Sequence, residues 1–173
     1  TEKIGLSTFQ KSSAFILMTN TFHRYTGARA ERKDKYGTDF AHRDDNFYFT
    51  AFNAILDDFP RSAFIQLHGF NKGLPARKEL NADLILSSSK IHNPAINLLA
   101  SQLKETLKNF TVSVYGDSVE ELGGTTNVHA RAILKRRSTG CFFHIEMSKE
   151  LRDSLVRDSS LRDSFIKLLA NIK

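Results

Sequence analysis

The sequence predicts an α/β fold in which a mixed, mostly parallel sheet is sandwiched by helices. Short apolar runs of strand length alternate along the chain with longer segments whose apolar residues repeat at helical spacing. Such alternation is typical of a sheet covered by helices. The chain has 173 residues, 40% of them hydrophobic and 25% charged. We therefore expect a single domain over residues 1–173 with a sizeable core.

The first part of the chain is expected to form two helices and two strands. A short opening helix is followed by a buried strand over residues 13–19, whose centre is the apolar run FILM. A helix over residues 47–58 carries its apolar side chains on one face, and Asp45 or Asn46 can cap its start. A second strand is expected around residues 63–67, because that run is apolar and bounded by turn residues.

The second part of the chain continues the alternation of strands and helices. Further strands are expected over residues 82–86, 111–115 and 140–147. A helix begins at Asn93-Pro94, because Asn is a favoured N-cap and Pro suits the first helical position. Ser148 can cap a terminal helix, and another helical segment starts near Ser160. The pattern of residues 128–134 leaves strand and helix open.

His68 is the first candidate for a chemical role. It stands where the strand around residues 63–67 is expected to end, and Gly69 after it permits a sharp turn. In open α/β sheets, ligands bind outside the carboxyl ends of the strands. His68 is therefore a candidate metal ligand or catalytic base. The alternative is a half-buried histidine whose ring nitrogens are hydrogen-bonded to backbone groups.

His144 and Glu146 form a second candidate group on the strand over residues 140–147. Side chains alternate along a strand, so these two point to the same face. Glu146 has apolar neighbours in the sequence, and a carboxylate is costly to bury without a partner. That favours either a general base or the partner of an arginine.

Other polar residues each have two interpretations. Arg43 suits a substrate carboxylate as well as an ion pair with Asp44 or Asp45. Asn127 closes a turn-rich loop, where it could hydrogen-bond a substrate or serve as an ordinary turn residue. His129 is expected to lie in a surface or loop position, and we assign it no role.

Charge and composition limit the classes of partner. The formal net charge is +6, and the basic residues cluster at 29–35 and 135–137. These clusters lack the exposed aromatics or reading helix of a nucleic-acid interface, so we expect no nucleic-acid partner. No segment approaches the roughly 18 consecutive apolar residues of a membrane span, so we expect no membrane partner. The positive charge suits an anionic substrate. The single Cys141 excludes an internal disulfide framework.

Five short blocks carry a resemblance to a known family. They are NTFHR (20–24), DFAHR (39–43), QLHGF (66–70), LGGTTN (122–127) and HIEMS (144–148). In this order they resemble bacterial proteins related to N-formylglutamate amidohydrolases and, more broadly, zinc carboxypeptidase-like hydrolases. The resemblance implies a three-layer α/β/α fold, a zinc ion and hydrolysis of an amide bond in a small acyl-amino acid or peptide.

The resemblance also implies roles for single residues. His68 matches a zinc ligand, and Glu146 matches the catalytic carboxylate. Arg43 matches the arginine that holds the substrate carboxylate. Asn127 falls where a substrate-contacting asparagine is expected.

The chain departs from the family at its start. The family places its first zinc ligands in an early Pro-His loop, whereas this chain opens at Thr1, which the resemblance places after that loop. We therefore expect a domain truncated at its N-terminus and lacking the early ligand pair. His23, His42 or His144 could replace the pair, or no metal is bound. The alternative function is a catalytically inactive relative that binds a carboxylate ligand or a protein partner.

Overall fold

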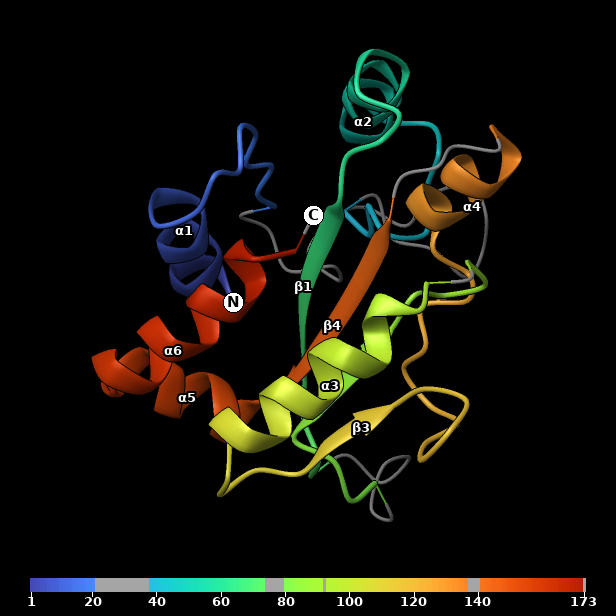
Figure 1. The fold of residues 1–173 in the computed structure, drawn as a ribbon. Helices are drawn as coiled ribbons and strands as arrows, with labels where there is room; N and C mark the ends of the chain where they lie inside the picture. The colour runs from blue at the N-terminus through green and yellow to red at the C-terminus, as the bar shows by residue number, and fades with distance from the viewer. Residues whose placement is uncertain (21–37, 74–79, 92, 137–140, 173) are drawn as a thin grey trace.

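The computed structural model describes residues 1–20, 38–73, 80–91, 93–136 and 141–172. The described part contains six helices and a four-stranded sheet (Figure 1). The elements in chain order are α1 (Glu2–Gln10), α2 (Phe47–Asp58), β1 (Phe64–Phe70), β2 (Leu84–Ser87), α3 (Ala95–Thr106), β3 (Val112–Val114), α4 (Val128–Lys135), β4 (Phe142–Ser148), α5 (Lys149–Arg157) and α6 (Ser159–Ala170). This confirms the predicted α/β fold. No helix among the described residues is long and apolar enough to cross a membrane.

The sheet is mixed, as the sequence predicted. Its strand order is β1-β4-β2-β3. The pairs β1–β4 and β2–β3 are parallel, and β2 runs antiparallel to β4. The register of β1 against β4 sets His68 opposite Glu146 and Gln66 opposite His144. Four polar residues from distant parts of the sequence thus meet at the centre of one strand pair.

One face of the sheet carries the main hydrophobic core. Phe143, Ile145 and Met147 of β4 are at most 1% exposed on this face. They pack in one cluster with buried residues of α1, α3, α5 and α6. Figure 1 shows α1, α5 and α6 grouped together. This closely packed apolar layer fixes the position of β1 and β4 from one face of the sheet.

The opposite face carries two smaller apolar clusters with polar residues between them. Phe142 and Phe64 pack against α2 and α4. Phe70 and Ile85 belong to a separate cluster. By strand alternation, the polar side chains of β1 and β4 lie on this face between the two clusters. They are Gln66, His68, His144 and Glu146.

Helices α2, α4, α5 and α6 begin at residues whose side chains cap them. Helices α1 and α3 have no side-chain cap, and the N-cap of α3 is Pro94 instead of the predicted Asn93. Asn46 accepts a hydrogen bond from the Phe49 N–H at the start of α2, and Ser148 accepts one from Leu151 at the start of α5. Residues 128–134, which the pattern left open, lie in helix α4. Asn127 caps this helix.

The predicted strand over residues 13–19 is wrong. These residues, all of which the structure describes, form no strand, and Phe15 and Ile16 are 54% and 43% exposed. The Phe15 ring packs instead on Phe59, with centroids 4.7 Å apart. An apolar run becomes a strand only where a neighbouring strand pairs with its backbone groups. The edge strands of the described sheet are β1 and β3, and residues 13–19 pair with neither.

Candidate metal centre

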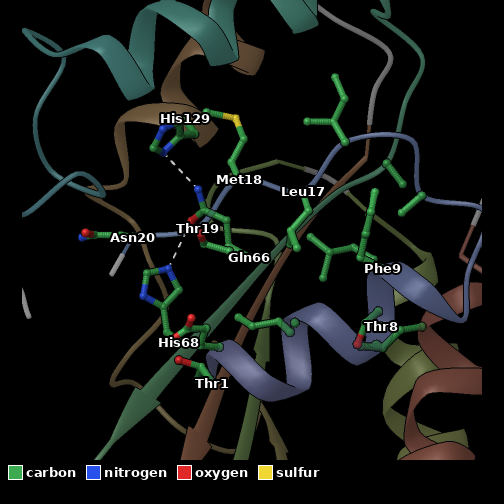
Figure 2. A pocket seen from close by; sticks show the side chains of 18 of the residues that line it. Thr1, Thr8, Phe9, Leu17, Met18, Thr19, Asn20, Gln66, His68 and His129 are labelled. Carbon is green, nitrogen blue, oxygen red and sulfur yellow. Dashed lines mark hydrogen bonds between the residues drawn. The ribbon is translucent and has the colours of Figure 1, made fainter. Parts of the chain in front are cut away.

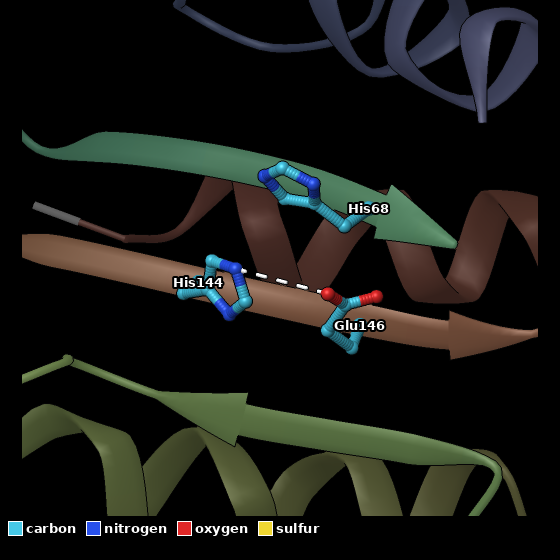
Figure 3. Close-up of side chains that lie close together, drawn as sticks. All are labelled: His68, His144 and Glu146. Atoms are coloured by element: carbon cyan, nitrogen blue, oxygen red, sulfur yellow. Dashed lines mark ion pairs between the residues drawn. The ribbon is translucent and has the colours of Figure 1, made fainter. Parts of the chain in front are cut away.

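His68, His144 and Glu146 form the one cluster of potential metal ligands found among the described residues. One ligand atom from each residue lies within 4.8 Å of the others. The His144 Nε2 and Glu146 Oε1 atoms are 3.9 Å apart, and the two imidazole centroids are 4.7 Å apart (Figure 3). The prediction that His144 and Glu146 share a face is confirmed, and the β1–β4 register brings His68 to them.

The donor set and its burial fit a divalent metal ion. His144 and Glu146 are buried, at 4% and 7% exposure, and His68 is half-buried. Two imidazoles and a carboxylate are ligands that zinc accepts, with bonds of about 2.0–2.2 Å. An ion bound by the imidazoles would lie near the Glu146 carboxylate, because His144 Nε2 and Glu146 Oε1 are 3.9 Å apart. It would also offset the cost of burying the carboxylate.

A glycine loop packs against the His144 ring. Gly124 has a φ of +62°, and a Cβ there would lie 3.0 Å from the imidazole. The loop is tied to the sheet because the Ser87 hydroxyl donates to the Gly123 carbonyl at 2.7 Å. The Ser89 hydroxyl donates to the Gly124 carbonyl at 3.0 Å. The glycine therefore permits the backbone to lie on the imidazole and limits the movement of that ring.

His68 lies within β1 rather than at its end. The predicted strand end there is wrong, because Gly69 pairs with Met147 and Phe70 pairs with Ser148. Gly69 does not turn the chain. A Cβ at this position would lie 2.7 Å from the Arg152 guanidinium, so the glycine makes room for that side chain. The candidate centre therefore lies on the face of the sheet, not beyond the carboxyl ends of its strands.

Gln66 connects His68 to two residues of the α4 segment. The Gln66 Nε2 group lies 3.0 Å from His129 Nδ1. The Asn127 Nδ2 group donates to Gln66 Oε1 at 2.7 Å, and His68 Nε2 lies 3.3 Å from the same oxygen. Figure 2 shows Gln66 between the two imidazoles, with a hydrogen bond to each.

His129 is buried, so its expected surface or loop position is wrong. It is 1% exposed, and its ring packs against Tyr48, Phe49 and Phe52. Burial, and then the charge of His68, lower the pKa of His129 to about 4. His129 is therefore neutral near pH 7. A helix over residues 128–134 predicts this burial, because His129 and the apolar Ile133 are four residues apart on one helical face.

Arg43 and Asn127, both predicted to contact substrate, lie in different settings. The Arg43 guanidinium donates two hydrogen bonds to the Asp45 carboxylate, at 2.8 and 2.6 Å. This is one of the ion pairs considered from the sequence. Asn127 is 1% exposed, and its side chain serves the α4 cap and Gln66. Contact of either residue with a substrate stays a prediction.

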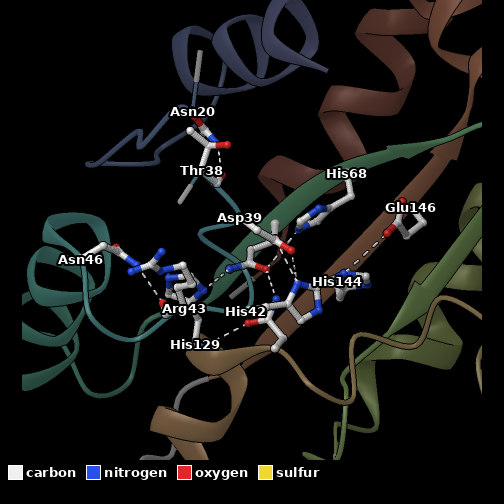
Figure 4. Close-up of polar contacts among 12 residues, drawn as sticks. Asn20, Thr38, Asp39, His42, Arg43, Asn46, His68, His129, His144 and Glu146 are labelled. Carbon is white, nitrogen blue, oxygen red and sulfur yellow. Dashed lines mark hydrogen bonds and ion pairs between the residues drawn. The ribbon is translucent and has the colours of Figure 1, made fainter. Parts of the chain in front are cut away.

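The loop over residues 39–43 is held beside the centre. The Asp39 carboxylate and His42 Nδ1 are 3.0 Å apart (Figure 4). The Val128 N–H donates to the Ala41 carbonyl at 2.9 Å, which ties the loop to the start of α4. Because of this tie, Arg43 and the α4 cap belong to one connected region. His23 lies outside the described residues.

A pocket of about 560 Å³ opens beside β1. Gln66, His68 and His129 supply polar groups to its wall, and residues 14–18 and α1 supply apolar ones (Figure 2). His144 and Glu146 are not among its lining residues. The pocket has the size and mixed lining of a small-molecule site, and it reaches the candidate centre through His68.

Compared with protein-family models, with curated proteins and with solved structures, the chain shows no significant match. The resemblance to N-formylglutamate amidohydrolase-like proteins therefore stays a prediction that rests on the short sequence blocks. Chemically, the site combines two imidazoles and a buried carboxylate with a neighbouring pocket. Such a set can hold a metal ion and transfer a proton.

Proposed function

We propose that the chain is a zinc-dependent hydrolase in which His68 and His144 bind the ion and Glu146 is the catalytic carboxylate. The observation that supports this most strongly is the close grouping of the three side chains on the paired strands β1 and β4. Bound zinc would polarise the scissile carbonyl and make a water molecule more acidic. Glu146 would take the proton from that water, because its carboxylate lies beside the same imidazoles.

The proposed substrate is a small acyl-amino acid or peptide that is cleaved at an amide bond. The amide bond follows from the resemblance, and the pocket of about 560 Å³ supports a small substrate. Arg43 would hold the substrate carboxylate. Its present partner Asp45 is 65% exposed, so exchanging this surface ion pair for a substrate costs little. The three-layer α/β/α arrangement is part of the same proposal, supported by helix packing on both sheet faces.

Metal content and turnover test the proposal together. The chain is purified without chelator, supplied with zinc, and analysed for elements and for hydrolysis of a panel of N-acyl-amino acids. We expect about one zinc per chain, and its loss in His68→Ala. His42→Ala is the matched control, because His42 pairs with Asp39 outside the cluster. Absence of zinc from the supplied wild-type chain would overturn the proposal.

A binding role without catalysis is the second candidate. The observation that favours it is that His144 and Glu146 are buried and do not line the pocket. In that case a carboxylate ligand or a protein partner would contact the pocket without reaching Glu146. Zinc binding without hydrolysis of any N-acyl-amino acid, together with saturable binding of a small carboxylate, would favour this function.

A further inference from the structure

The backbone of α4 fixes the orientation of the Asn127 side chain. The Oδ1 atom of Asn127 accepts hydrogen bonds from the N–H groups of His129 and Ala130, at 3.0 and 3.3 Å. Backbone N–H groups can only donate, so the atom that faces them must be the amide oxygen. The other end of the amide is then the NH₂ group. The Gln66 atom 2.7 Å from it must therefore be the oxygen.

The orientation of the Gln66 amide in turn determines which ring nitrogen carries the proton in both neighbouring imidazoles. With Oε1 facing Asn127, the Gln66 NH₂ group faces His129 Nδ1 at 3.0 Å, and that nitrogen must accept. His68 Nε2 lies 3.3 Å from Gln66 Oε1, so a hydrogen bond there requires a proton on Nε2. The backbone N–H groups of α4 thus set the donor and the acceptor of each hydrogen bond, first at Asn127, then at Gln66 and finally at the two imidazoles.

We propose that Asn127 and Gln66 are positioning residues that hold His68 in the Nε2–H tautomer and so present its Nδ1 lone pair to the metal. The inference rests on the proposed function, because it assigns the ligand nitrogen of that same site. Metal-binding histidines commonly donate their other ring N–H to an oxygen, and this bond sets the tautomer and the ring orientation. Here the amide oxygen of Gln66 accepts that hydrogen bond from His68 Nε2.

Burial makes the Asn127 and His129 ends of this chain of hydrogen bonds selective. These two residues are each 1% exposed, so water cannot easily replace a misdirected hydrogen bond at their side chains, whereas Gln66 and His68 are half-buried. The pKa of His129 is lowered to about 4, chiefly by burial. The neutral ring keeps Nδ1 as an acceptor for Gln66, which favours the same amide orientation that Asn127 requires.

Asn127→Asp is the sharpest test, because it should reverse the tautomer while keeping the helix cap. Aspartate is a good N-cap, but its second oxygen cannot donate to Gln66. The Gln66 amide then turns its NH₂ group to the carboxylate and to His68 Nε2. His68 must accept at Nε2 and carry its proton on Nδ1. His129, which now faces the amide oxygen, must also move its proton to Nδ1.

Long-range ¹H–¹⁵N correlation spectra of the metal-free full chain report these tautomers. In the wild type we expect an unprotonated Nδ1 and a protonated Nε2 on His68, and the reverse in Asn127→Asp. Asn46→Asp is the matched control, since Asn46 caps α2 in the same way, with its Nδ2 donating to the Arg43 carbonyl. The control should leave the His68 spectrum unchanged. An Nδ1–H tautomer in the wild type, or no change in Asn127→Asp, would overturn the inference.

Zinc titration gives a second measurement. We expect Asn127→Asp to bind zinc about 10–100-fold more weakly than the wild type, as for other outer-shell changes, and Asn46→Asp to bind it normally. Equal affinities for the wild type and Asn127→Asp would contradict the inference. If the wild type binds no zinc, the proposed function fails, and the spectra of the metal-free chain still decide the tautomer.

A pair of Gln66 variants keeps the inference testable if Asn127→Asp does not fold. Gln66→Glu retains an oxygen that can accept from Asn127 and His68, so His68 should remain in the Nε2–H form. Gln66→Met has a similar length but cannot accept these bonds, so His68 should populate both tautomers. The same tautomer in both variants would show that Gln66 does not position His68.

Discussion

At the scale of single residues, Glu146 combines burial with reactive neighbours. It lies beside His144 on β4 and opposite His68 on β1, and it is 7% exposed. Under the proposed function, a carboxylate in this setting would serve either as a proton acceptor or as a metal ligand. A substitution that removes the charge but keeps the shape separates these two roles.

Glu146→Gln should abolish turnover while zinc content stays near that of the wild type. The amide cannot take a proton from water, and loss of a general base lowers rates by about 10²–10⁴-fold. Elemental analysis and a hydrolysis assay measure the two effects. Normal turnover would remove Glu146 from the mechanism, whereas loss of zinc would make it a ligand instead.

His129 should make stability depend on pH in the acidic range. The pKa is about 4 in the folded protein and near 6.5 for an ordinary histidine, so the unfolded chain binds the extra proton first as the pH falls. The neutral His129 ring therefore contributes to the free energy of unfolding in full above about pH 6.5, and this contribution is lost as the pH falls toward 4. It amounts to about 3 kcal/mol.

Urea unfolding between pH 7 and pH 4 measures this dependence. His129→Asn keeps an acceptor near Gln66 but removes the titrating ring, so its stability should fall less steeply over this range. A wild-type His129 ring that titrates near pH 6.5 in NMR spectra of the folded chain would contradict the prediction.

At the scale of elements, capping residues connect the helices to the sheet. Ser148 ends β4 and caps α5, where its Oγ accepts from the Leu151 N–H at 3.2 Å. The same hydroxyl donates to the Asp83 carboxylate at 3.1 Å. Burial alone would raise the pKa of Asp83, but hydrogen bonds from Lys72, Thr111 and Ser148 outweigh it and lower that pKa. One buried side chain thus joins a strand, a helix and an acidic loop residue.

Ser148→Ala should lower the free energy of unfolding by about 1–2 kcal/mol, because the cap and the bond to Asp83 are both lost. Chemical denaturation measures the loss. Ser101→Ala is the matched control, since Ser101 is exposed within α3 and caps nothing. Equal stabilities of the two variants would show that the cap contributes nothing.

At the scale of the whole molecule, the sheet separates the core from the candidate centre. Alternate residues of β4 serve the two faces: Phe143 and Ile145 pack into the main core, and His144 and Glu146 face the polar side. The main core therefore fixes the position of β4, and with it the candidate centre, from the opposite face of the sheet. Large changes in the core should destabilise the fold without altering the chemistry of the ligand set.

Phe143→Ala should cost about 3–5 kcal/mol, because Phe143 is 1% exposed in the largest cluster. That is a large part of the stability of a typical domain. Phe47→Ala is the control, since Phe47 is 85% exposed and should change stability by less than about 0.5 kcal/mol. Thermal and urea unfolding measure both variants. A loss below about 1 kcal/mol in Phe143→Ala would contradict the assigned core.

The sequence by itself determined most of the helices and strands. Helix α2 begins at Phe47 and ends at Asp58, as its apolar spacing and a cap at Asp45 or Asn46 predicted, and Asn46 is the residue that caps it. The shared face of His144 and Glu146 also followed from local rules, because strand alternation depends only on the backbone of one segment. Caps and periodicity depend on interactions within a few residues, so the sequence alone is enough to predict them.

Only the tertiary structure decided the strand pairing and, through it, the site. The apolar run over residues 13–19 has no strand partner, whereas the β1–β4 register places His68 beside His144 and Glu146. The half-buried link from Asn127 through Gln66 to His68 likewise spans about sixty residues of sequence. Local patterns do not specify such contacts, because they arise when distant segments bury their surfaces together.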